Sequence, residues 1–454
     1  MKPTKSEEDV KDVKERLGHG AIRDWPELAN RVATTTRPTT TGTSFSFAFL
    51  NNHFNLSDTS YTEVLSVVVT NPGTVSASIT ITAPLFSSFT TINQNVPAGQ
   101  SVYIPINPVT IQTNYGDQLM EIILRSSNAL FLTSTQPVSV VAENQHSDGT
   151  SSDTFSLIPN CELGSSYKVV SDTSRLTTTN VFVAVATVDY TLINIYESGG
   201  FNYSAGLMRG QTATTRFAHR MNKQKTGLQQ SVQLAPISDW GTTFPIAPFL
   251  PSNVTWLVIL AAEPNTTIYK DGQLLGLRPT PDTFLLYQLD TPQMLTSNKP
   301  IQLVAVGASD NQGNSAPFFI NMPPTTWYTS QPVQFATGMT VQDQTLNTHY
   351  IRITTTESYL RSMTIDGIDA SDLSYTHIGH EDYYYVDVKV NNGTHSVATL
   401  PGTTGTPSFN VLVYGYGSYI GYGFSPGLSL PRTFTISSLC YVVMRFAETT
   451  SGSC

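Results

Sequence analysis

Three groups of polar side chains have the residue types that metal binding or catalysis requires. His377, His380, Glu381 and Asp382 form the densest group of possible metal ligands. In a helix His377 and Glu381 would share one face, and in a strand His380 and Asp382 would do so. The tyrosines on both sides favour a hairpin with polar residues at its tip, and we assign no metal to this group.

Asp366, Asp369 and Asp372 carry oxygen ligands of the kind that calcium prefers. Their spacing differs from that of an EF-hand loop, and Asp366 with the glycine after it has the composition of a tight hairpin turn. The sequence therefore predicts a turn at this place.

A catalytic triad is the third possibility, because His146, Ser147 and Asp148 are adjacent. Neighbouring loop residues do not usually converge on one another, and no serine here has the strand-to-helix context of a nucleophile turn. We therefore expect no catalytic residue, no cofactor and no enzyme activity.

The densest aromatic segment lies near the end of the chain and is a candidate binding site. Exposed aromatic rings stack on sugars or anchor a protein partner. The alternative is that the rings pack a terminal strand in which glycine permits a bulge. The tyrosines of this segment are Tyr414, Tyr416, Tyr419 and Tyr422, and glycines are interleaved with them.

The elements that must position these side chains are repeated. An apolar phrase occurs three times, and in each copy a proline precedes a large apolar residue by four positions. Those apolar residues are Leu163, Trp240 and Trp327, and the proline of the third copy is Pro323. The repeat indicates a chain built from similar modules, and the shared position predicts that all three apolar residues are buried at module junctions.

A strand before the phrase and a hairpin after it are repeated as well. The segment from Leu132 to Ala142 matches the segment from Leu295 to Ala305, with the same spacing to an internal proline. The turn dipeptides that follow at matching places are Ser198-Gly199, Asp271-Gly272 and Asp366-Gly367.

The composition agrees with a large protein made of strands. Of the 454 residues only 13% are charged, and long stretches alternate β-branched or aromatic residues with small polar ones. The sequence predicts an all-β protein of tandem antiparallel β-sandwich-like modules with a short N-terminal helix over residues 6–18. The alternative is a propeller-like ring of sheets, which would use the same signals.

We divide the chain into six parts on the basis of the repeats. A charged short helix and a Thr-rich linker precede four β modules, and a last strand with a tail follows them. The boundaries are 1–42 for the helix and linker, 43–158, 159–235, 236–322 and 323–430 for the modules, and 431–454 for the strand and tail.

Charge and hydropathy exclude two classes of partner. The net charge is −9 and the basic residues are scattered, so the chain has no patch that would neutralise nucleic acid phosphates. No apolar run reaches the roughly 18 residues of a membrane span. The composition suits an extracellular or cell-surface protein, although no signal peptide is visible in the charged first 16 residues.

The three cysteines are too few for a disulfide scaffold. A bridge between Cys161 and Cys440 would tie the first phrase to the last strand, while an unpaired buried thiol is equally compatible with the sequence. Cys454 is the last residue and suggests a link to another chain or a chain cut from a longer one. Possible N-glycosylation sequons occur at Asn55, Asn202, Asn253, Asn265 and Asn392.

Residues 43–428 together resemble one N-terminal domain of the IgGFc-binding protein family. The resemblance rests on the strand at Pro137 and the phrase after it, on the strand at Pro300 with its following Pro-Pro and Trp327, and on the Tyr/Gly segment that ends at Tyr422. Where the family carries a Cys-Asp-His cluster, this chain has Ala316, Pro317 and Phe318. The family's usual disulfide is therefore not implied here.

The resemblance implies a non-enzymatic extracellular protein that acts in adhesion or in association with mucus or matrix. The implied partners are extracellular glycoproteins, mucins or glycans. Immunoglobulin Fc binding is not carried over, because no residue here can be matched to that contact. The alternatives are a structural spacer within a longer multidomain protein and a hydrolase on a β scaffold.

Overall fold

The computed structural model describes residues 40–449 except 51–62, 114–122, 148–151, 169–179, 197–201, 218–226, 252–253, 279–283, 308–317, 339–345, 406–407, 418–419 and 430–439. All described residues belong to the compact unit formed by residues 38–454. The helix expected over residues 6–18 and most of the expected linker lie outside the described residues.

Antiparallel strands dominate the described chain, which confirms the predicted all-β class. Helical structure in this part of the chain is limited to short 3-10 turns. These are η1 (Val109–Ile111), η2 (Asn160–Glu162), η3 (Ile237–Asp239), η4 (Thr325–Trp327) and η5 (Glu357–Ser362).

The first and third groups of strands have the same topology, in which one long strand pairs with four others and two more strands extend the sheet. The first group consists of β1 (Gly42–Phe47), β2 (Glu63–Asn71), β3 (Ala77–Thr82), β4 (Ile92–Val96), β5 (Gln100–Ile106), the long β7 (Leu130–His146) and β8 (Ser152–Ser156). The third group consists of β14 (Gly241–Ile246), β15 (Thr255–Ala261), β16 (Thr266–Lys270), β17 (Gln273–Arg278), β18 (Phe284–Leu289), the long β19 (Gln293–Gly307) and β20 (Phe318–Met322).

Each long strand changes partners at a proline. Residues 131–134 of β7 pair with β3 and residues 139–146 pair with β2, so Pro137 lies between the two ladders. Pro300 lies between the corresponding ladders of β19. Proline has no amide hydrogen to donate to a ladder, and it is tolerated where the pairing passes from one neighbour to the next. The repeated strand seen in the sequence is this long strand.

The fourth group divides the long strand into two. β27 pairs with β21 and β23, and β28 pairs with β22 and β29. The members are β21 (Val333–Thr337), β22 (Leu346–Thr355), β23 (Met363–Ile365), β24 (Ile368–Asp369), β25 (Thr376–His377), β26 (Tyr384–Val390), β27 (Gly393–Thr399), β28 (Phe409–Gly417) and β29 (Ile420–Phe424).

The second group takes strands from distant parts of the sequence. Its sheet has the order β13-β30-β9-β12-β6, and β10 pairs with β11 in a separate hairpin. The members are β6 (Ile123–Ser126), β9 (Asn180–Ala186), β10 (Thr191–Tyr196), β11 (Asn202–Leu207), β12 (Thr212–Phe217), β13 (Gly227–Gln233) and β30 (Cys440–Thr449). β6 precedes β7 in the chain, and β30 follows the whole fourth group.

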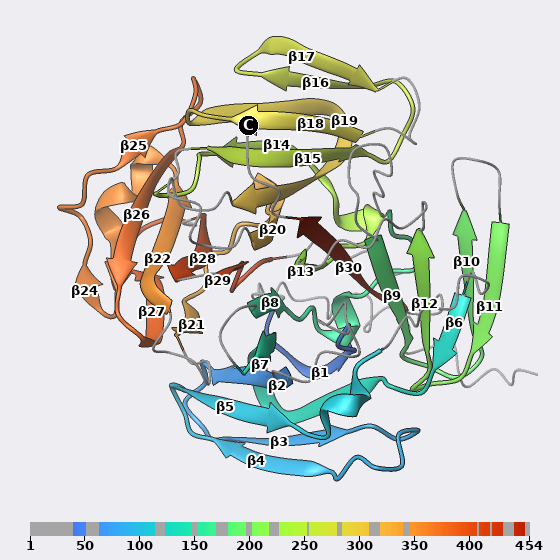
Figure 1. Cartoon of the computed structure of the whole chain (residues 1–454). Helices are drawn as coiled ribbons and strands as arrows, with labels where there is room; N and C mark the ends of the chain where they lie inside the picture. Colours follow the sequence, from blue (N-terminus) through green and yellow to red (C-terminus); the bar gives the residue numbers. More distant parts are fainter. Residues whose placement is uncertain are drawn as a thin grey trace, which may run out of the picture. The chain divides into compact units, whose positions relative to one another are not determined.

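One strand of each group lies innermost in this unit (Figure 1). These strands are β8, β13, β20 and β29 for the first, second, third and fourth groups. β8 contacts β13 and β29, and β20 contacts the same two strands. The four groups therefore follow one another in a cycle, which favours the ring of sheets over a linear string of sandwiches. The sequence-based boundaries of the modules stay a prediction.

The repeated phrase forms the 3-10 turns η2, η3 and η4. These turns begin after Pro159, Pro236 and Pro324, because each of those carbonyls accepts a bond from the amide three residues later. The alignment on Pro323 is therefore wrong by one residue. Trp327 is equivalent to Glu162 and Asp239, and Tyr328 is the residue equivalent to Leu163 and Trp240. Burial of Leu163, Trp240 and Trp327 is nevertheless confirmed.

A glycine near the start of three groups lies against the proline that closes the same group. A methyl group on Gly164 would lie 2.3 Å from Cβ of Pro236, and one on Gly241 would lie 2.3 Å from Cβ of Pro324. Gly42 has the same relation to Pro159. Glycine is required because a side chain cannot fit into this contact.

Two of the three predicted hairpin turns are confirmed. Asp271 and Gly272 have φ values of 45° and 78°, and Asp366 and Gly367 have values of 53° and 76°. Positive φ at both central residues is the geometry of a type I′ turn. Ser198-Gly199 lies outside the described residues.

Candidate functional site

The predicted aromatic binding segment lies in β28 and β29 and is buried. Tyr414, Tyr416 and Tyr422 are 0, 6 and 4% exposed. The expectation that a face of this segment reaches solvent is therefore wrong for these three rings, which pack inside the protein. Tyr419 lies outside the described residues.

A buried arginine explains the burial of Tyr414. The guanidinium of Arg352 on β22 lies 4.8 Å from the ring centroid of Phe249 and 5.8 Å from that of Tyr414. Arg352 also donates to two backbone carbonyls in the loop after β14, at Ala247 and Pro248. The aromatic rings shield this cation from water, so the tyrosine segment joins the fourth group to the third.

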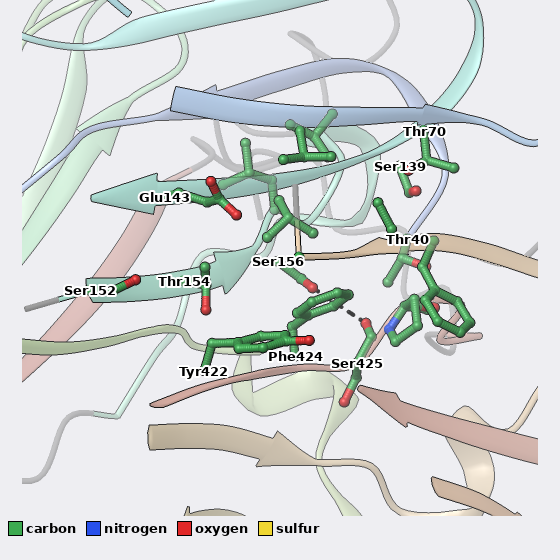
Figure 2. A pocket seen from close by; sticks show the side chains of 18 residues that line it. Thr40, Thr70, Ser139, Glu143, Ser152, Thr154, Ser156, Tyr422, Phe424 and Ser425 are labelled. Carbon is green, nitrogen blue, oxygen red and sulfur yellow. Dashed lines mark hydrogen bonds between the residues drawn. The ribbon is translucent and has the colours of Figure 1, made fainter. Parts of the chain in front are cut away.

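A groove between the first and fourth groups is the candidate functional site (Figure 2). Residues of β2, β7 and β8 form one wall, and residues of β21 and β29 form the other. The cavity enclosed by the groove has a volume of about 30 Å³. Its lining is mainly small hydroxyl side chains and apolar side chains.

Three of the hydroxyl side chains come from one face of β8. Ser152, Thr154 and Ser156 alternate along the strand and line the groove, because successive side chains of a strand point to opposite faces. Phe155 points the other way and packs in the core of the first group. The hydroxyl of Ser156 donates across the groove to the carbonyl of Ser425 at 3.5 Å.

Three buried hydroxyls that line the groove have no hydrogen-bond partner among the described residues. They belong to Ser152, Thr154 and Ser425, which are 2, 5 and 5% exposed. A buried hydroxyl that makes no hydrogen bond costs about 1 to 3 kcal/mol. Each of these three groups would gain a hydrogen bond if a water molecule or a ligand group reached it.

Glu143 on β7 is the one carboxylate among the described residues that line the groove. It is 5% exposed, faces Thr154 directly in the ladder, and accepts a hydrogen bond from the hydroxyl of Ser66 at 3.1 Å. The stacked rings of Tyr422 and Phe424 lie on the opposite wall (Figure 2). A carboxylate, several hydroxyls and an aromatic wall suit noncovalent binding of a hydroxyl-bearing ligand.

The repeat shows that the fold does not require polar residues at this place. Ala142 pairs with Phe155 in the first group as Ala305 pairs with Ile320 in the third. The next pair is Glu143 with Thr154 in the first group, and it is Val306 with Phe319 in the third. The third group packs its apolar pair into a hydrophobic cluster with residues of the second group.

Sequence reasoning missed this groove. The alternation of Ser152, Thr154 and Ser156 was an available signal for one polar face of β8. The facing wall comes from β21 and β29, at the far end of the sequence, and no local pattern indicates which segments meet.

The predicted metal-type group is not brought together as a metal site. His380 lies 3.7 Å from a carboxylate oxygen of Asp271 and 3.8 Å from one of Glu381. The ring of His377 packs on Tyr384. Asp382 accepts a hydrogen bond from the backbone amide of Glu357. Within the described ranges, no three residues of the metal-binding types form a cluster.

Two of the three aspartates considered for calcium make hydrogen bonds within the protein. Asp366 accepts hydrogen bonds from the amide of Ser396 at 2.7 Å, and its second oxygen lies 2.8 Å from Nδ1 of His395. Asp369 accepts a hydrogen bond from the backbone amide of Ser371 at 2.8 Å. The triad of adjacent residues is not tested, because Asp148 lies outside the described residues.

The predicted modification sites are described only in part. Asn265 and Asn392 are exposed, the side chain of Asn202 is not described, and Asn55 and Asn253 lie outside the described residues. Sγ of Cys161 lies 3.6 Å from a carboxylate oxygen of Glu162. The side chain of Cys440 is not described, so the bridge between Cys161 and Cys440 stays a prediction.

The fold and the groove together define an all-β protein with a site suited to noncovalent binding. Residues 227–415 match the family model described as IgGFc binding protein, which confirms the resemblance over this range. No curated protein matches the chain. Most residues that line the groove lie outside the matched range. No helix in the described part of the chain is long and apolar enough to cross a membrane.

Proposed function

We propose that this chain is a non-enzymatic extracellular binding protein that acts in adhesion or in association with mucus or matrix. Its partners are hydroxyl-rich ligands, namely the glycans of extracellular glycoproteins and mucins, which it contacts through the groove between the first and fourth groups. The buried pair of Glu143 and Thr154 carries this proposal, because the third group fills the same place with an apolar pair. The match of residues 227–415 to a family of binding proteins supports the same class.

The chemistry of the groove supports binding over hydrolysis. We expect a sugar hydroxyl to donate to the carboxylate of Glu143 and to accept from the unpartnered hydroxyl of Thr154. Glycoside hydrolysis ordinarily uses two carboxylates about 5 to 10 Å apart. Among the described lining residues, Glu143 is the single carboxylate.

Binding to a glycan array and to immobilised mucin tests this function. We expect Thr154→Val and Glu143→Gln each to weaken binding at least tenfold, because each removes one hydrogen-bonding group and keeps the side-chain size. Thr80→Val is the control, since its hydroxyl bonds Asn93 at an exposed place on β3. Equal binding by all four proteins would move the site elsewhere, and hydrolysis of any glycan would overturn the class.

The apolar pair of the third group supplies a matched variant. Glu143→Val combined with Thr154→Phe copies Val306 and Phe319 into the first group. We expect this double variant to fold, to keep its thermal unfolding midpoint and to lose ligand binding. Retained binding with a filled groove would contradict the proposed site.

A further inference from the structure

The second group lacks a long strand of its own. Pro324 follows the last residue of β18 by 35 positions, and this interval contains the long β19 and β20. Pro236 follows the last residue of β12 by only 19 positions. β13 uses seven of those residues, so too few remain for a second strand as long as β19.

β30 occupies the place of the missing strand. Cys440 pairs with Ala186 as Ile301 pairs with Ala261. On the other side, Met444 pairs with Val232 of β13. The third group shows the same offset, because Ala305, four residues after Ile301, pairs with Ile320 of β20. Both ladders of β30 therefore have the register of the long strand in the third group.

β30 holds the second group together through these two ladders. It forms seven residue pairs with β13 and six with β9. Within the described residues, β13 joins this sheet through β30 alone. Without β30, β9 and β13 would both present unpaired backbone groups at an inner position of the ring, where burial without a partner is costly.

We infer that the gap between β9 and β13 is an acceptor site for a β-strand, which residues 440–449 of the same chain fill and which a separate peptide of this sequence can also fill. Main-chain hydrogen bonds to both neighbours supply the affinity, as in other cases of strand addition to an open sheet edge. The insertion closes the cycle of the four groups, because β13 is the innermost strand of the second group.

Peptide exchange into the full chain tests the acceptor site. A unique protease site is placed within residues 431–438, the folded protein is cut, and a fluorescent peptide of residues 440–449 is added in excess. We expect saturable uptake of the peptide after cutting and none before it. A peptide with Val443→Pro should not bind, because proline cannot donate to the ladder. Cutting without uptake of the intact peptide would overturn the inference.

A disulfide cross-link in the uncut protein tests the position of β30 even if the cut protein unfolds. The variant carries Val232→Cys and Met444→Cys, with the three native cysteines changed to serine. We expect a disulfide within one chain, and none for the control pair Val232→Cys and Arg445→Cys, which is out of register. No disulfide in the first variant, or a disulfide between two chains, would show that the strand is not supplied within the chain.

Discussion

The guanidinium of Arg352 faces the carboxylate of Asp387 across the neighbouring strands β22 and β26. Nη2 lies 2.6 Å from one carboxylate oxygen and Nε lies 2.8 Å from the other. The two side chains are 2 and 6% exposed. Two parallel hydrogen bonds of this kind are the strong geometry for such a pair. The contacts of Arg352 with the loop after β14 make the pair a bridge between the fourth and third groups.

Removal of one partner of this pair should be strongly destabilising. We expect Arg352→Met to lower the free energy of unfolding by about 3 to 5 kcal/mol, because Asp387 is left as a buried charge without its partner. Urea unfolding measures the change. The double variant Arg352→Met with Asp387→Leu is the control, and it should recover a large part of the loss. A single variant as stable as the parent would contradict the bridge.

Trp240 should be a stability residue. It is 5% exposed, and its indole nitrogen donates to the carbonyl of Ala235 at 3.2 Å. We expect Trp240→Ala to cost about 3 to 5 kcal/mol, as other buried aromatic truncations do. Thermal unfolding and mucin binding are measured together on the same variant. A variant that keeps its melting temperature and loses a ligand would show that the ring binds instead of packing.

The contact of Gly164 with Pro236 should reject a methyl group. We expect Gly164→Ala to destabilise the protein by about 1 to 3 kcal/mol, since the new Cβ would lie 2.3 Å from Cβ of Pro236. Gly206 on β11 is the matched control, because a methyl group there meets no atom within 4 Å. Equal melting temperatures for the two variants would refute the tight contact between the ends of the second group.

Asp239 should make stability depend on pH. Burial, together with the charge of Glu162, raises the pKa of Asp239 from 3.8 to about 7, although a bond from Ser238 opposes the rise. Between these values the folded chain keeps a proton that the unfolded chain has lost, so stability falls as pH rises from about 4 to about 7.

The variant Asp239→Asn cannot titrate at this position and should remove that part of the pH dependence. We expect its stability relative to the parent to increase across this range by on the order of 2 to 4 kcal/mol and to stay constant above it. Urea unfolding at a series of pH values measures the difference. A difference that does not change with pH would show that Asp239 has an ordinary pKa.

Much of the fold was predictable because its signals are local. The long strands with Pro137 and Pro300, and the turns at Asp271 and Asp366, follow from alternation and turn chemistry within a few residues. The phrase was found, but its third copy was aligned on the wrong one of two adjacent prolines, because only the hydrogen bond from the amide of Trp327 identifies Pro324.

The candidate site was not predictable, because exposure is not a local property. Tyr414 lies in β28 and Thr154 in β8, yet the first is covered by Arg352 and the second faces a groove. By itself, the sequence determined the strands, the turns and the repeat, since these depend on neighbouring residues. Only the tertiary structure decided which strand lies beside which, as with β30 between β9 and β13. Buried backbone and side-chain groups are costly without hydrogen-bond partners, and the segments that supply these partners are far apart in the chain.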